Sequence, residues 1–80
     1  MKVYNITEQN INKFFEVVEN CEGKIELVAE GFRVDLKSRF AQYLSIAKIF
    51  FNEEVKELEL LAYNQEDVNR LIQFMTESGR

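Results

Sequence analysis

The chain has 80 residues, enough for a single domain over 1–80 with a modest core, and its composition is that of a globular protein. Its net charge of −4 at pH 7 argues against binding to the phosphate backbone of nucleic acids. No stretch approaches the roughly 20 apolar residues of a membrane-spanning helix, and no apolar signal segment opens the chain. We therefore expect a cytoplasmic protein that does not associate with membranes, and the single cysteine, Cys21, suits that reducing compartment.

Alternating apolar residues predict a short strand over 1–6. Thr7 is the predicted N-cap of the helix that follows, because its hydroxyl can accept a hydrogen bond from a free amide of the first turn. Gly23 is the predicted end of this helix, since glycine readily adopts a left-handed conformation. Residues spaced i, i+3, i+4 and i+7 form the stripe that the helix is expected to bury, namely Ile11, Phe14, Phe15 and Val18.

Apolar residues alternate over 25–29 and again over 32–36, on either side of Glu30-Gly31. This pattern predicts a β-hairpin with one buried face. Ser38 is the predicted cap of a second helix. The stripe expected to be buried in that helix consists of Phe40, Tyr43, Leu44, Ala47 and Phe51.

Three further apolar residues of the second helix, Ile46, Ile49 and Phe50, fall off that stripe. One interpretation is an exposed contact surface for a partner protein, or for a second copy in a homodimer. The other is that the helix is buried more deeply, so that its wider stripe belongs to the core. The sequence supports both interpretations equally.

The second helix is expected to break at Asn52-Glu53-Glu54, and a fourth strand to run from near Val55 to Ala62. Asn64 is the predicted cap of the last helix, with Asp67 at its third position. Val68, Leu71, Ile72 and Met75 make the apolar stripe of that helix. The resulting order is β-α-β-β-α-β-α, which packs most simply as an antiparallel sheet with the helices on one side.

The stretch Gly31-Phe32-Arg33-Val34-Asp35-Leu36-Lys37-Ser38 is similar to a Gly-x-x-Val-Asn-Leu-Lys-Ser run in the HPr family. HPr proteins are the phosphocarriers of the bacterial phosphoenolpyruvate-dependent sugar phosphotransferase system, and their order of elements is also the one predicted here. The resemblance covers almost all of the chain. It implies an α+β two-layer sandwich, with a four-stranded antiparallel sheet of order 1423 and three helices on one face.

HPr carries its phosphoryl group on a histidine that is followed by Ala-Arg-Pro, and this chain has no histidine. An ungapped count back from Ser38 places the histidine position of the family at Thr7, its arginine at Gln9 and its proline at Asn10. A hydroxyl without an adjacent base is a poor nucleophile. We therefore expect no phosphocarrier activity and no catalytic residue.

The resemblance also implies that Ser38 is a regulatory phosphorylation site, because an ATP-dependent kinase phosphorylates the matching serine in many Gram-positive HPr proteins. A phosphate at a helix N-cap is stabilised by the free amides of the first turn. The alternative is that Ser38 acts only as a helix cap. Arg39 and Phe40 replace the small or aliphatic residues that follow this serine in the family, which puts recognition by that kinase in question.

We expect a non-catalytic, HPr-like protein with a regulatory or adaptor role, which binds proteins of the phosphotransferase system or of transcriptional regulation. The alternative is a ferredoxin-like module that senses a small molecule or dimerises, whose strands would follow the order 4132. No cofactor or metal is expected, because a zinc site needs more histidine or cysteine ligands than this chain has. The carboxylates that could suggest a cation site, Glu53, Glu54, Glu57 and Glu59, are interpreted as a solvated face.

Overall fold

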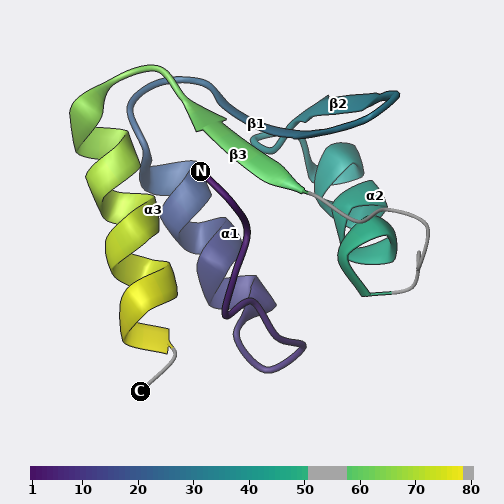
Figure 1. Ribbon diagram of the computed structural model, residues 1–80, viewed down its shortest axis with the longest axis horizontal. Coiled ribbons are helices and arrows are strands. Elements are labelled where there is room, and N and C mark those ends of the chain that lie inside the picture. Colours follow the sequence, from purple (N-terminus) through teal and green to yellow (C-terminus); the bar gives the residue numbers. More distant parts are fainter. Residues whose placement is uncertain (51–57, 79–80) are drawn as a thin grey trace.

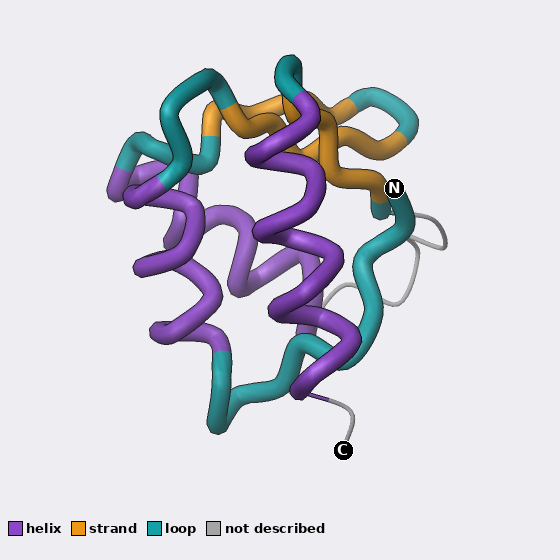
Figure 2. Tube along the Cα trace, turned by 90° about the vertical axis from the view of Figure 1, so that its left-hand side faces the viewer, coloured by secondary structure: helices purple, strands orange, loops and turns teal. Residues whose placement is uncertain are grey.

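The computed structural model describes residues 1–50 and 58–78 of the chain. An antiparallel sheet forms one layer, and the three helices lie together on one side of it (Figures 1 and 2). The fold is therefore α+β. Its elements in chain order are α1 (Ile11–Asn20), β1 (Ile25–Ala29), β2 (Phe32–Asp35), α2 (Arg39–Phe50), β3 (Glu59–Ala62) and α3 (Gln65–Ser78).

The sheet has three strands in the order β2-β1-β3, so β1 lies in the middle and pairs with both neighbours. Leu27 in β1 faces Val34 in β2 and Leu60 in β3. The predicted hairpin is confirmed, and Gly31 closes its tight turn with a φ of 71°, a conformation that favours glycine. Side chains alternate across the sheet, so Leu27 points to the helices and its neighbour Glu26 to the open face.

The strand predicted over 1–6 is wrong in extent, because only Lys2 forms a bridge, to Glu59 at the start of β3. Backbone hydrogen bonds join the two segments on either side of this bridge, from Val3 N to Leu58 O at 3.1 Å and from Leu60 N to Met1 O at 2.7 Å. The chain then turns away from the sheet.

The turn away from the sheet occurs at Asn5, whose φ of 56° is incompatible with an extended strand. The Asn5 side chain donates to the carbonyl of Met75 at 2.8 Å, and the Tyr4 hydroxyl lies 2.9 Å from Thr76 Oγ1. These contacts to the last turns of α3 replace the strand pairing that the alternating sequence pattern predicts.

Thr7 opens the turn before α1 and is not its N-cap, which is Asn10, so the predicted cap is wrong. Its hydroxyl still accepts a hydrogen bond from Asn10 N at 3.3 Å, while Asn10 Oδ1 accepts one from Thr7 N at 2.8 Å. The helix itself begins at Ile11. Its C-cap is Cys21 in an extended conformation, so the prediction that Gly23 ends the helix is also wrong.

The core lies between the sheet and the helices, and the predicted stripe of α1 is confirmed as part of it. Phe14 is the largest fully buried side chain, and its ring packs against the half-buried Phe74 with centroids 5.9 Å apart. On α3, Leu71 and Met75 are buried as predicted, whereas Ile72 is 40% exposed. The other side chains that are less than 2% exposed and apolar are Val18, Ile25, Leu27, Leu36 and Leu60.

Candidate functional site

The start of α2 presents Ser38 on the surface, in the first turn after β2. Ser38 N donates to Asp35 O at 3.1 Å, and Lys37 N donates to Asp35 Oδ1 at 2.9 Å, so that the Asp35 side chain shapes the turn. The Ser38 hydroxyl accepts a hydrogen bond from Ala41 N at 3.4 Å, a long contact for a cap. Ser38 is thus both the predicted helix cap and an exposed hydroxyl.

This corner of the fold is tied to the end of α1 by two polar side chains. The Lys37 ammonium donates to the carbonyl of Cys21, the C-cap of α1, where a positive charge is favourable. Gln42 is buried and donates to Leu36 O at 2.9 Å and to Glu19 Oε1 at 3.4 Å. These contacts lie at and just before the first turn of α2 and connect it to the end of α1.

The face of α2 that is buried is not the one predicted. Ala41 and Ser45 are buried, and Ser45 Oγ donates to Ala41 O at 2.7 Å. Phe40 and Tyr43 are each 72% exposed, and Leu44 is 38% exposed. We call these three residues the α2 face. Of the remaining residues of the predicted stripe, Ala47 is exposed and Phe51 lies outside the described residues.

The reversal has a physical cause in the even distribution of apolar residues around α2. Small residues, Ala41 and Ser45, face inward, and the buried Gln42 amide donates to the Leu36 carbonyl. Periodicity alone cannot choose between two apolar stripes of similar strength.

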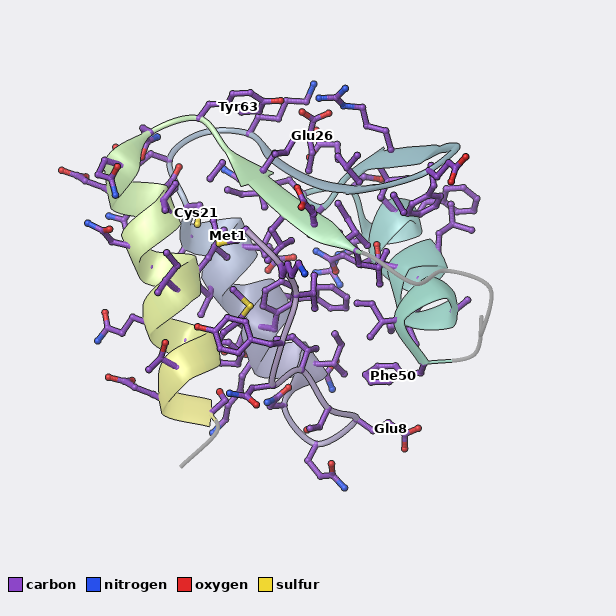
Figure 3. All side chains as sticks on the ribbon, viewed as in Figure 1. Met1, Glu8, Cys21, Glu26, Phe50 and Tyr63 are labelled. Atoms are coloured by element: carbon purple, nitrogen blue, oxygen red, sulfur yellow. The ribbon has the colours of Figure 1, made fainter. Side chains whose placement is uncertain are left out.

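Ile46, Ile49 and Phe50, the residues considered as partner contacts, are half-buried and pack against the core. Figure 3 shows the Phe50 side chain directed from the end of α2 toward α1. The structure therefore favours the interpretation of these three residues as a wider core stripe. The exposed apolar surface of this helix is instead the α2 face.

Thr7, Gln9 and Asn10, which the sequence comparison with HPr singled out, form the turn before α1. Thr7 and Gln9 are exposed, and Thr7 is hydrogen-bonded to Asn10 and, through its carbonyl, to Ile11 N at 2.9 Å. Asn10 Nδ2 also donates to Asn5 O at 2.7 Å. The side chains of Thr7 and Asn10 thus hold the turn that starts the helix.

A buried carboxylate, Asp67, joins the start of α3 to the turn between α1 and β1. It accepts hydrogen bonds from Glu22 N at 3.0 Å, Gly23 N at 2.8 Å, Asn64 Nδ2 at 2.9 Å and Arg70 Nη1 at 2.7 Å. Burial acts to raise the pKa of Asp67, but the hydrogen bonds of the Gly23 and Glu22 amides, with those of Asn64 and Arg70, lower it to about 2.

Asn64 is the N-cap of α3, as predicted, because its Oδ1 accepts a hydrogen bond from Asp67 N at 2.9 Å. Cys21 lies close to the Asp67 carboxylate and is 4% exposed. Burial raises the pKa of its thiol, and the charge of Asp67 raises it further. A thiol of this kind is a poor nucleophile, so the cluster around Asp67 is structural.

The open face of the sheet carries a second polar cluster, which the sequence pattern did not indicate. Figure 3 shows Glu26 and Tyr63 on the side of the sheet away from the helices. Arg33 donates to both carboxylate oxygens of Glu26, at 2.8 and 3.3 Å, and the Tyr63 hydroxyl donates to the same carboxylate. The hydrogen bond from Arg33, followed by that from Tyr63, lowers the pKa of Glu26 to about 2.

Among residues 1–50 and 58–78, no group of three or more His, Cys, Asp or Glu is placed to hold a metal ion. Glu59 is exposed at the start of β3, and Glu53, Glu54 and Glu57 lie outside the described residues. None of the described helices is long and apolar enough to cross a membrane. A shallow groove between α1 and α3 is lined by Val17, Asn20, Arg70, Gln73, Phe74 and Glu77.

Comparisons with protein-family models, with curated proteins and with solved structures gave no significant match to this chain.

Proposed function

We propose that the protein is a non-catalytic, HPr-like binding module that recognises a protein partner through the α2 face, with Ser38 as a phosphorylation switch. The observation that carries the proposal is the exposure of Phe40 and Tyr43, each 72%, on the helix that begins directly after Ser38. Large aromatic side chains at this exposure are typical anchors of protein interfaces. Its partners would be proteins of the phosphotransferase system or of transcriptional regulation.

The pairing of the strands supports an HPr-like arrangement over a ferredoxin-like one. If the segment 1–3 is counted as a first strand, its hydrogen bonds to β3 and the pairing of β1 with both β2 and β3 correspond to the order 1423. In the ferredoxin-like order 4132, the second and fourth strands would not be neighbours. The pairing of β1 with β3 therefore argues against the ferredoxin-like alternative.

The chemistry of the chain argues against phosphocarrier activity. No imidazole exists to accept a phosphoryl group, and the Thr7 hydroxyl accepts a hydrogen bond from Asn10 N rather than facing a general base. A regulatory role through binding needs neither group. In this proposal the protein would share with HPr proteins only the binding of partner proteins, and not the transfer of a phosphoryl group.

Ser38 is expected to take up one phosphate when the protein is incubated with ATP and an HPr kinase. The exposed hydroxyl and the free amides at the start of α2 suit a phosphoserine at this position. Intact mass spectrometry would detect the addition, and Ser38→Ala is the control. A phosphate that persists in Ser38→Ala, or none in the wild type, would leave Ser38 as a helix cap.

The double variant Phe40→Ala with Tyr43→Ala is expected to weaken partner binding by about tenfold or more while leaving stability nearly unchanged. The probe is the phosphoenolpyruvate-dependent enzyme that phosphorylates HPr proteins, titrated into labelled protein and followed by NMR. The wild type should show shifts at the α2 face. Shifts confined to α1 and α3, or unaltered binding of the double variant, would contradict the proposed surface.

A further inference from the structure

The outer edge of β2 carries backbone groups that no described strand pairs. β2 is an edge strand of the sheet, and Leu36 N donates to Ile25 O at 2.8 Å just beyond the position where Asp35 faces Glu26. Bonded and non-bonded pairs alternate along an antiparallel ladder. The backbone groups of Arg33 and the amide of Asp35 therefore point away from β1, toward the outside of the sheet.

The side chains on this edge are of opposite charge and two residues apart, so Arg33 and Asp35 share the open face of the sheet. Consider an antiparallel pairing with a second copy in which Val34 faces Val34. Arg33 of each copy then lies directly opposite Asp35 of the other, and the outward backbone groups of these two residues meet.

Other registers that bring outward backbone groups together are disfavoured by charge. Centring the pairing on Arg33 places two arginines opposite each other, and centring it on Asp35 places two carboxylates opposite each other. Like charges directly across a strand pair are destabilising. Among the registers that pair Arg33 and Asp35 with each other or with themselves, only the one centred on Val34 is thus complementary in charge.

Existing contacts direct the Arg33 guanidinium over β1 and leave some polar atoms of both side chains unused. Arg33 donates to Glu26 through Nε and Nη2 and to the Tyr63 hydroxyl through Nη2, and Asp35 accepts from Lys37 N through Oδ1. Among the described residues, Arg33 Nη1 and Asp35 Oδ2 have no hydrogen-bond partner in the fold. The Asp35 carbonyl accepts from Ser38 N at 3.1 Å, which limits the backbone bonding at that end of the strand.

We propose that the protein forms a weak homodimer in which β2 pairs antiparallel with β2 of a second copy, joining the two sheets into one. The inference goes beyond the proposed binding function and does not depend on it. The strand is only four residues long, so the buried area falls well below that of a tight, permanent dimer. The association is reversible and depends on protein concentration.

Sedimentation equilibrium and concentration-dependent NMR of the full chain test the proposal. The wild type is expected to dimerise as its concentration rises, with shifts at the Arg33 and Asp35 amides and smaller ones at Val34, whose amide faces β1. Asp35→Lys and Arg33→Glu each place like charges opposite one another in the dimer. Each is expected to weaken association by about tenfold or more.

An equimolar mixture of Asp35→Lys and Arg33→Glu restores opposite charges across both contacts, so the mixture is expected to associate nearly as tightly as the wild type. Glu16→Lys is the matched control, because Glu16 is exposed on α1 and the change in net charge equals that of Asp35→Lys. If a charge reversal fails to fold by circular dichroism, Asp35→Asn replaces it, since asparagine keeps an oxygen for Lys37 N. That variant should weaken dimerisation several-fold.

A wild type that stays monomeric at NMR concentrations would overturn the proposal. So would charge-reversed variants that dimerise as the wild type does, or a mixture that recovers nothing. Concentration-dependent shifts that gather on the α2 face instead of β2 would also overturn it, and would assign self-association to that helix.

Discussion

Asp67→Ala is expected to lower the melting temperature by roughly 10 °C or more. The substitution leaves the amides of Glu22 and Gly23 without the acceptor that now satisfies them, and it removes the nearer of the two acidic partners of Arg70. It also unties the start of α3 from the turn between α1 and β1. Thermal unfolding followed by circular dichroism measures the loss.

Glu66→Ala is the matched control for Asp67→Ala, because Glu66 is the preceding residue of the same helix turn and carries the same charge. Its carboxylate is 72% exposed and lies 3.8 Å from Arg70, so its loss should change the melting temperature by only a few degrees. Equal losses in the two variants would show that the effect comes from net charge and not from the buried hydrogen bonds.

The same carboxylate gives the stability a predictable dependence on pH. The pKa of Asp67 is lowered to about 2 in the folded protein, so its stabilising effect is fully present above the pKa of about 4 in the unfolded chain. The effect is lost as the pH falls from about 4 toward 2, and Glu26 acts in the same direction. Asp67→Asn should therefore show a shallower loss of melting temperature over this range than the wild type.

Phe14→Ala is expected to reduce the free energy of unfolding by about 3–5 kcal/mol. This is a large part of the roughly 4–12 kcal/mol available to a domain of this length. Phe14 is 1% exposed and packs from α1 against Phe74 of α3, where truncation leaves a cavity that the surrounding helices cannot fill. Urea denaturation monitored by circular dichroism measures the change.

Phe40→Ala provides the contrast, because the same substitution at a side chain that is 72% exposed should cost no more than about 0.5 kcal/mol. Comparing Phe14→Ala with Phe40→Ala also tests which side of α2 is buried. A large cost at Phe40 would mean that the helix buries the stripe predicted from the sequence, and that the α2 face does not exist as a free surface.

Local sequence patterns were sufficient to predict an element and its buried face where one face of that element is clearly apolar. The stripe of α1 repeats at helical spacing with polar residues between, and the buried side chains Phe14 and Val18 follow it. The β1–β2 hairpin followed from alternation around Gly31, and the cap of α3 from Asn64. Such features depend on residues that are close in the sequence, so they can be predicted without knowledge of the tertiary structure.

Two features could not be predicted in this way: which side of α2 is buried, and the point at which the segment 1–6 leaves the sheet. Helix α2 has apolar residues on two sides, and the side that carries Ala41, Gln42 and Ser45 is buried, with Gln42 hydrogen-bonded to Leu36 and to Glu19 of α1. The alternating segment over 1–6 leaves the sheet at Asn5, because that side chain bonds to Met75, far along the chain.

The sequence by itself determined the α+β class, the hairpin, the core face of α1 and the absence of any imidazole for phosphoryl transfer. Only the tertiary structure decided which aromatic residues are exposed, which carboxylates are held by hydrogen bonds and which strand forms the edge of the sheet. The physical reason is how far apart in the sequence the interacting residues lie. Periodicity and capping arise from neighbours within a turn or two, whereas Asp67 and Glu26 each also accept hydrogen bonds from segments more than 30 residues away.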